Sequence, residues 1–404
     1  MSKPAHVGPY ELVEVIAQSD IALSYGVQLR TRSGADRIAA MKVLNPQVTS
    51  RGNFARRLTE QARLAAQLNH VNLAQTWDCG CRDGVYYLLL EYVEGVPLSV
   101  LLGDDKVLPA DVATYIAAEV CAGLSYAHAR RDDNGEPLGV VHGDVRPRHV
   151  MVSGAGAVKL VDFGVARARK MSEDDPVPEN LREIDLFGYA DPQHAAGADP
   201  TVASDIFTVS ALLYRMLSGR PLYDGTSCKA VQQLAREAAI PSVADAVPGI
   251  DPELAAIIQK GLATDPADRH SSAQALRSAL SGWLRTAAAG FGRHKVKEHF
   301  GDGLGDTIQQ RRARALTRRE FEPMDSASVI YKTENLPKNP PSIDLRAIFT
   351  AGADPFARDA PTIAYTGALP RVGTMMLTPE MDDEDDVAPA PPVAPAPPVA
   401  PAPP

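Results

Sequence analysis

Two short segments constrain this 404-residue chain more than any other feature of its sequence. Residues 141–150 read Val-His-Gly-Asp-Val-Arg-Pro-Arg-His-Val, and residues 161–164 read Val-Asp-Phe-Gly. Each segment contains one aspartate, and the two aspartates, Asp144 and Asp162, lie 162 − 144 = 18 positions apart.

The apolar pattern divides the chain into a β-rich part followed by an α-rich part. Apolar runs and apolar alternation predict strands over residues 10–16, 37–44 and 86–93. Helical periodicity predicts helices over residues 54–68, 110–128, 201–218 and 252–262. Because strands come first and helices dominate later, we expect an α+β fold of two lobes with a cleft between them.

The two segments resemble the catalytic loop H-R-D-L-K-P-x-N and the metal-binding D-F-G loop of eukaryotic-type protein kinases. Ala40-Met41-Lys42 resembles the strand lysine of that family, and residues 88–95 resemble the hinge between its lobes. The resemblance covers residues 10–286 in the family's order and is closest to bacterial serine/threonine kinases. It implies a bilobal protein kinase-like fold, with an N-lobe over residues 10–95 and a C-lobe over residues 96–286.

The resemblance also implies roles for individual residues. Asp144 would accept the proton of a substrate hydroxyl, and Arg146 would neutralise the transferred phosphoryl group in place of a lysine. Lys42 would hold the phosphates of ATP and pair with a residue of the first helix, which is Gln61, or Glu60 if the register shifts by one. Backbone groups at Glu91 and Val93 would contact the adenine.

The phosphate-binding loop of the family departs from its pattern here. The three glycine positions are filled by Ala17, Ser19 and Ala22. Ser24 replaces the valine that packs on adenine in the family. Glycine allows the backbone to approach the phosphates closely. We therefore expect ATP to bind weakly, with Asp20 adding an unfavourable negative charge.

The metal site and the catalytic loop depart as well. Asp162 matches one metal ligand, but His149 replaces the asparagine that would hold the second Mg²⁺. Mg²⁺ prefers oxygen ligands in strict octahedral geometry, so an imidazole is a poor substitute. Gly143 replaces the arginine that would bind a phosphorylated activation segment, and it offers no charge-assisted bond.

In the activation segment, Leu186 and Gln193 replace a threonine and a glutamate of the family pattern. The glutamate would pair with a buried arginine, here Arg269, whose charge is costly unless Gln193 or Asp191 satisfies it. Asp205 matches the helix aspartate that anchors the catalytic loop. Structural features thus match the family better than chemical ones.

Three functions remain open from these residues. The chain could be a pseudokinase that signals through a kinase-shaped surface, which the accumulated replacements favour. It could be a divergent active serine/threonine kinase that uses Lys42, Asp144 and Asp162 with ATP and Mg²⁺. It could also be a scaffold that acts mainly through its tail.

The composition narrows the remaining properties. Residues 287–319 form a basic linker, and within it residues 293–319 favour a solvated segment over a short amphipathic helix. Residues 320–404 predict a disordered acidic and proline-rich tail. The terminal proline repeat predicts a ligand for a proline-binding protein, a spacer or a truncated end. A net charge of −9 argues against nucleic-acid binding, and no apolar run predicts a signal peptide or a membrane span, so we expect a cytoplasmic protein with protein partners. Cys79 and Cys81 are expected to pack in a core.

Overall fold

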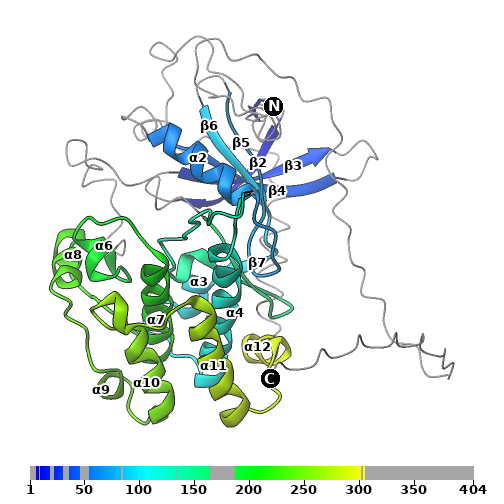
Figure 1. Cartoon of the computed structure of the whole chain (residues 1–404). Coiled ribbons are helices and arrows are strands. Elements are labelled where there is room, and N and C mark those ends of the chain that lie inside the picture. The colour runs from blue at the N-terminus through cyan, green and yellow to red at the C-terminus, as the bar shows by residue number, and fades with distance from the viewer. Residues whose placement is uncertain are drawn as a thin grey trace, which may run out of the picture. The chain divides into compact units, whose positions relative to one another are not determined.

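The protein's structure is a computed structural model that describes residues 6–8, 10–18, 22–30, 36–45, 54–82, 85–132, 134–163, 187–301 and 304. All of these residues belong to one compact unit, 1–364. The expected order of a β-rich part and an α-rich part is confirmed (Figure 1). The described strands form two sheets, and most of the described helices follow them in the chain.

The larger sheet has six antiparallel strands in the order β1-β2-β3-β4-β6-β5. Its strands are β1 (His6–Val7), β2 (Tyr10–Gln18), β3 (Ala22–Arg30), β4 (Asp36–Leu44), β5 (Thr76–Arg82) and β6 (Val85–Glu91). The strands predicted over residues 10–16, 37–44 and 86–93 are confirmed as β2, β4 and β6, although β6 ends at Glu91, two residues early.

Helix α2 (Phe54–Ala66) covers one face of this sheet. Its side chains Leu58 and Ala62 pack with Leu44 of β4 and Leu88 of β6 in one apolar cluster. Successive residues of a strand point to opposite faces, so the face of β4 that carries Leu44 also carries Lys42. Met41 and Val43 belong instead to a cluster on the other face. This alternation places Lys42 on the side of the sheet that faces α2.

The smaller sheet and the helices make up the rest of the described structure. The sheet has the order β7-β8-β9, with β7 (Gly95–Pro97), β8 (Val150–Ser153) and β9 (Val158–Leu160). The helices are α3 (Leu98–Leu102), α4 (Ala110–His128), α6 (Pro192–Ala195), α7 (Val202–Ser218), α8 (Cys228–Arg236), α9 (Val243–Ala246), α10 (Pro252–Gly261), α11 (Ala273–Ala287) and α12 (Arg293–Phe300), with 3-10 turns η1 (Pro147–His149) and η4 (Pro266–Asp268). The helices predicted over residues 110–128, 201–218 and 252–262 are confirmed.

Helix α7 runs through the centre of the helical core, and every one of its residues from Ser204 to Leu217 is buried. It begins with a capping box, in which Thr201 accepts from the backbone of Ser204 and the Ser204 hydroxyl accepts from the backbone of Thr201. It ends at Gly219, which adopts a left-handed φ of 78°. These caps fix the first turn of α7, which carries Asp205.

Helix α12 corrects one expectation for the basic segment. Sequence favoured solvation there, but residues 293–300 are helical, and Val296 is fully buried. A Cβ added to Gly156, on the turn between β8 and β9, would lie 2.0 Å from the carbonyl oxygen of Arg293. Only glycine permits this approach, which docks the start of α12. The tail after residue 304 lies outside the described residues.

Candidate active site

Lys42 forms an ion pair with Asp162, which reaches it from the segment after β9. In β4, Lys42 lies opposite Ser24 of β3 and Leu88 of β6. Among the residues that the structure describes, neither Gln61 nor Glu60 bonds to Lys42. The lysine and the aspartate predicted from sequence are therefore brought together, but the predicted pairing of Lys42 with the first helix is absent from the described contacts.

The catalytic-loop segment is anchored by Asp205. Both carboxylate oxygens accept backbone N–H groups, with Oδ2 at 2.9 Å from His142 N and Oδ1 at 2.7 Å from Gly143 N. His128 adds a 2.8 Å contact from Nε2 to Oδ2. Burial raises the pKa of Asp205, but the hydrogen bond from His128 and the neighbouring groups outweigh this and lower the pKa below its usual value. The loop is thus held by an ionised, fully buried carboxylate.

Gly143 has a backbone φ of 77°, in the left-handed region that favours glycine. Its N–H is one of the two that bond to Asp205. A larger residue here would have to adopt a strained conformation to keep this bond, at a cost of about 1–2 kcal/mol. The glycine therefore suits the loop conformation, even though it supplies no side chain for binding phosphate.

Asp144 is held by Arg146, two residues further along the same loop. Arg146 Nε lies 2.9 Å from Asp144 Oδ1, and the arginine side chain is only 1% exposed. An arginine buried this deeply has to be paired. Arg146 is therefore paired with Asp144 in this structure. The family resemblance predicts that the cation at this position neutralises the transferred phosphoryl group.

His149 lies between the two candidate aspartates. Its Nδ1 is 2.7 Å from the backbone carbonyl oxygen of Asp144, and its Nε2 is 3.5 Å from Oδ2 of Asp162. Burial lowers the pKa of His149 to about 4, although the carboxylates of Asp144 and Asp162 oppose the shift. The imidazole is consequently neutral near neutral pH.

Asp162 is buried and ionised. Burial by itself raises the pKa of Asp162, but the ion pair with Lys42 lowers it, and the result is a pKa of about 2. Lys42 bonds to Oδ2, whereas Oδ1 is buried without a hydrogen-bond partner in the described part of the chain. The backbone of Asp162 has a φ of 72°, which is uncommon outside glycine and marks a constrained position.

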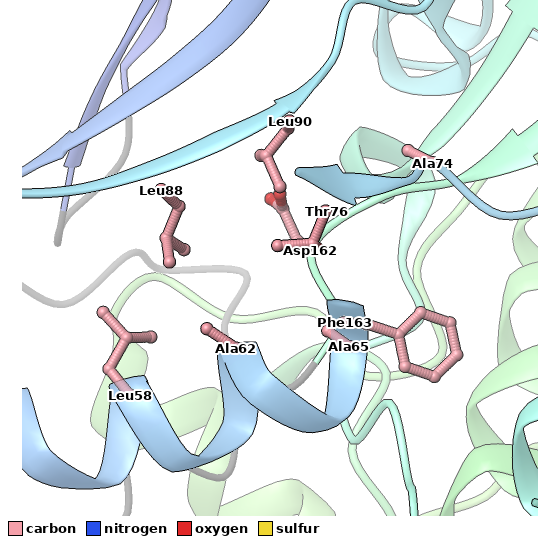
Figure 2. A pocket seen from close by; sticks show the side chains of 9 residues that line it. All are labelled: Leu58, Ala62, Ala65, Ala74, Thr76, Leu88, Leu90, Asp162 and Phe163. Atoms are coloured by element: carbon pink, nitrogen blue, oxygen red, sulfur yellow. The ribbon is translucent and has the colours of Figure 1, made fainter. Parts of the chain in front are cut away.

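Asp162 and Phe163 also line a small pocket beneath the sheet (Figure 2). Leu58 and Ala62 of α2 and Leu88 and Leu90 of β6 line the same pocket. The pocket encloses a cavity of about 10 Å³, which is close to the lower limit for one water molecule. The apolar side chains of α2 thus occupy the space next to Asp162.

The predicted nucleotide contacts are partly described. Ala17 on β2 is exposed and pairs in register with Ser24, which is buried on β3, as is Ala22; Ser19 lies outside the described residues. In the hinge, the Glu91 carboxylate bonds to Lys159 Nζ at 2.8 Å. The Val93 carbonyl accepts from Gly95 N at 2.7 Å. The Glu91 side chain therefore ties the hinge to β9.

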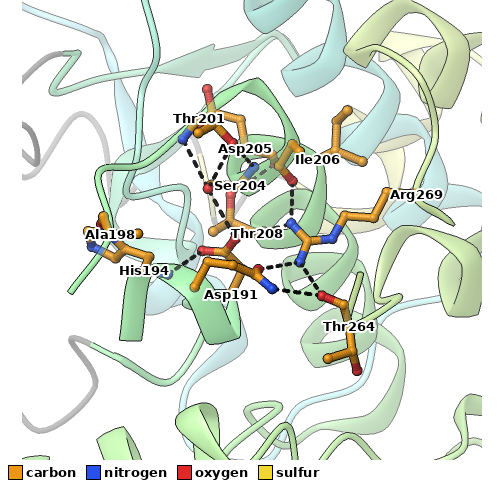
Figure 3. Close-up of polar contacts among 12 residues, drawn as sticks. Asp191, His194, Ala198, Thr201, Ser204, Asp205, Ile206, Thr208, Thr264 and Arg269 are labelled. Atoms are coloured by element: carbon orange, nitrogen blue, oxygen red, sulfur yellow. Dashed lines mark hydrogen bonds and ion pairs between the residues drawn. The ribbon is translucent and has the colours of Figure 1, made fainter. Parts of the chain in front are cut away.

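A second buried ion pair lies where the activation segment joins the helices (Figure 3). Arg269 Nη1 donates to Asp191 Oδ2 at 3.1 Å, and Arg269 Nη2 donates to Gln193 Oε1 at 2.8 Å. The Ser204 hydroxyl also donates to Asp191, at 3.1 Å. Both alternatives that the sequence offered for Arg269 are used, and Asp191 supplies the negative charge. Leu186 lies outside the described residues.

Sequence reasoning missed His128. This residue closes α4 and contacts Asp205 across 77 positions of sequence. No sequence motif marks His128, which lies 142 − 128 = 14 residues before His142. Its contact with Asp205 depends on how α4 packs against α7.

The geometry does not suit magnesium well. Mg²⁺ takes oxygen ligands in near-ideal octahedral geometry, whereas the two predicted metal-binding side chains offer one imidazole nitrogen and a carboxylate already paired with Lys42. Among the described residues, no group of three His, Cys, Asp or Glu side chains could hold a metal ion by itself. No described helix is both long and apolar enough to pass through a lipid bilayer.

Residues 24–281 match the family model of the protein kinase domain. The chain is 30% identical over 306 residues to the tyrosine-protein kinase MasK of Myxococcus xanthus, covering 73% of this chain and 46% of the relative. It is 30% identical over 289 residues to the serine/threonine-protein kinase PknB of Mycobacterium leprae, covering 69% and 44%. The chain thus spans somewhat less than half the length of these curated relatives.

The fold is similar to that of the crystallised kinase domain of PknI from Mycobacterium tuberculosis. The TM-score is 0.54 at 25% sequence identity, and the match covers 70% of this chain and 98% of that domain. The expected two-lobed fold and the resemblance to bacterial serine/threonine kinases are both confirmed.

Proposed function

Because this chain belongs to the protein kinase family, we propose that it is a catalytically impaired member, a pseudokinase that binds ATP weakly and serves as a signalling or scaffold module. The proposal concerns residues 10–286 as the kinase-like domain, followed by a linker and a tail. It assigns the domain's purpose to the surface that the fold presents rather than to phosphoryl transfer.

One observation carries this proposal: both candidate aspartates are already paired with cations of the same site. Lys42 is bound to Asp162, and Arg146 is bound to Asp144. Kinase catalysis depends on metal ions and cations that act on the phosphates of ATP. Here, Mg²⁺ and the phosphates would have to compete with two internal ion pairs that lie largely out of water.

The replaced glycines support the same conclusion. Ala17, Ser19 and Ala22 carry side chains at the three positions where the family brings backbone close to the phosphates. Three features each raise the barrier to transfer: weaker phosphate contacts, an imidazole at a metal position, and a Lys42 whose described ion pair is with Asp162 and not with α2. Every 1.4 kcal/mol lost slows the reaction about tenfold.

The alternative function is a divergent active serine/threonine kinase. Its support is that Lys42, Asp144 and Asp162 are all present, and that His149 lies within 3.5 Å of the carboxylates of both aspartates. The names of the bacterial relatives also favour it. In this alternative, ATP and Mg²⁺ would separate the Lys42–Asp162 pair on binding.

Phosphoryl transfer from γ-labelled ATP distinguishes the two functions. The full chain is incubated with ATP, Mg²⁺ and a generic protein substrate, beside the Asp144→Asn variant. We expect no label above background in either protein. If the wild-type chain labels itself or the substrate and Asp144→Asn abolishes the label, the chain is an active kinase.

The tail is proposed to recruit partners in the cytoplasm. The repeat over residues 387–404 favours the polyproline II conformation, which aromatic grooves bind at low entropic cost. Deleting the repeat should remove a partner from pull-downs without changing the melting temperature of the domain. An unchanged set of partners would make the repeat a spacer.

A further inference from the structure

Another pocket of the described structure lies between α4 and α11, which pack side by side in the helical part of the protein (Figure 1). Its volume is about 190 Å³, and the turn from α11 to α12 contributes Gly290 and Phe291 to its lining. None of the lining residues belongs to the catalytic loop, to β4 or to the segment that carries Asp162. The pocket is thus separate from the candidate active site, and an inference drawn from it does not depend on the proposed function.

Part of the lining is apolar and aromatic. Ala118 of α4 and Leu284 of α11 are buried side chains. Tyr115 and Phe291 supply two rings whose centroids lie 5.5 Å apart. An apolar cavity of about 150 Å³ is large enough to hold benzene. The larger volume here therefore suits one aromatic ring with a short side group.

The polar part of the lining carries a formal charge of 2 − 1 = +1. Arg277, Ser281 and Arg285 follow one another at intervals of four residues along α11, so they lie on one face of the helix. Neither arginine makes an ion pair or a side-chain hydrogen bond with the residues that the structure describes. Glu119 of α4 is the acidic side chain of the lining, and its carboxylate accepts from Asn72 Nδ2 at 2.9 Å. The two guanidinium groups are therefore available to an anion.

We propose that this pocket binds a small aromatic carboxylate, with the ring among the apolar side chains and the carboxylate toward Arg277 and Ser281. Arginine binds a carboxylate through two parallel N–H donors, and a serine hydroxyl can donate a further hydrogen bond. The formal charge of the lining matches a ligand with one negative charge, whereas Glu119 disfavours a dianion such as a phosphate monoester. The half-buried Arg277 contributes more to binding than Arg285, which is exposed.

Binding at this site should be coupled to the docking of α12. Phe291 donates its backbone N–H to the carbonyl of Ala288 at 3.0 Å, and the chain then enters α12, whose Val296 is fully buried. The start of α12 lies against Gly156, where an added Cβ would come within 2.0 Å of the Arg293 carbonyl oxygen. A ligand that packs on Phe291 binds best when α12 is docked, so it stabilises this arrangement by mass action.

Binding of 4-fluorophenylacetate to the full chain, followed by fluorine NMR, tests the assignment. The matched neutral probe is 4-fluorophenylacetamide, because it keeps the ring and the shape but loses the charge. The site variants are Arg277→Gln and Arg285→Gln, which each remove one charge, and Ala288→Leu, which fills part of the pocket. Arg220→Gln is the control variant, because Arg220 is exposed beyond the end of α7 and does not line the pocket.

We expect wild type and Arg220→Gln to bind the acid at least about tenfold more tightly than the amide, because the amide lacks the charge that strengthens its bonds to arginine. Arg277→Gln and Ala288→Leu should each weaken binding of the acid about tenfold, and Arg285→Gln about threefold. Equal affinity for the two probes would overturn the assignment. Acid binding that is unchanged in both Arg277→Gln and Ala288→Leu would overturn it as well.

Amide hydrogen exchange locates the bound acid without any substitution. In wild type, the acid should slow exchange in residues 291–300, because it holds Phe291 and the docked α12 in place. Slowing that is confined to residues 141–163 would place the acid in the candidate active site and contradict the proposal. Neither measurement involves phosphoryl transfer, so the proposed function and this binding site stand or fall separately.

Discussion

Asp205 and Asp144 are two carboxylates of the same lobe that are held in contrasting ways. Asp205 accepts from two backbone N–H groups and from His128, and it is fully buried. The carboxylate of Asp144 is contacted by side chains, those of Arg146 and His149, both from the same loop segment. Backbone donors remain after any side-chain substitution except proline, so the anchor is robust, whereas the active-site contacts depend on side chains that can be exchanged.

The pair formed by Asp191 and Arg269 extends this comparison. The family pattern places a glutamate at position 193, and here the negative charge comes from Asp191 instead, with Gln193 adding a neutral bond. The buried arginine has kept an acid partner. At this fold-supporting ion pair a nearby residue supplies the acid, whereas at the phosphate site the sequence carries side chains at all three glycine positions.

Removing the anchor should give the largest effect on stability. Asp205→Asn keeps the shape but turns an NH₂ group toward a backbone N–H, which leaves buried donors unpaired. We expect a loss of about 3–5 kcal/mol in the free energy of unfolding, measured by urea denaturation. Asp224→Asn on the exposed surface is the control and should change it by less than about 0.5 kcal/mol. A small loss for Asp205→Asn would contradict the view that Asp205 holds the catalytic loop more firmly than Asp144 is held.

Variants at Asp191 and Gln193 should show how much each of these partners of Arg269 contributes to stability. Asp191→Asn leaves the buried charge of Arg269 without an acid and should cost about 3 kcal/mol. Gln193→Ala removes only hydrogen bonds of a neutral side chain, which accepts from Arg269 and donates to the carbonyl of Thr264. We expect it to lower the free energy of unfolding by about 1 kcal/mol. Urea denaturation of both variants measures the ratio. Equal losses would mean that Gln193, and not Asp191, is the main partner of Arg269.

The pH dependence of stability should show a smaller effect at the active site. Burial lowers the pKa of His149 to about 4 from 6.5, while Asp144 and Asp162 raise it and Arg146 and His142 lower it further. Between those pH values the unfolded chain binds a proton that the folded chain does not, so stability falls as the pH falls. In metal-free buffer we expect a loss of about 2 kcal/mol from neutral pH to about pH 5.

His149→Asn is the control for this pH effect. The variant has no imidazole at this position, so its stability should change less over the same range. If wild type and variant lose stability in parallel, His149 is not the group responsible for the acid sensitivity.

Local patterns predicted most of the fold. Strands β2 and β4 and helices α4 and α7 have apolar residues at the expected period, because each buries one face or nearly its whole surface. Helix α12 could not be predicted in this way. It is mostly charged and exposed, and it depends on Val296 and on the approach to Gly156.

The site was predictable in its members but not in its pairings. Spacing and order identified Lys42, Asp144 and Asp162. The partner of Lys42 lies 120 positions away, and only the packing of the two lobes shows that it is Asp162 and not a residue of α2. For Arg269, sequence left Gln193 and Asp191 as alternatives, and the structure uses both.

Titration of ATP into the full chain, with Mg²⁺ and then with a chelator of divalent ions, tests the central claim most directly. The claim is that Lys42 and Arg146 are already paired with the two active-site carboxylates, so that magnesium has to compete with these ion pairs. We predict weak ATP binding whose affinity differs by less than about threefold between the two conditions, against the tenfold that 1.4 kcal/mol of metal-dependent binding would give. Tight binding with Mg²⁺ that collapses on chelation would contradict the account.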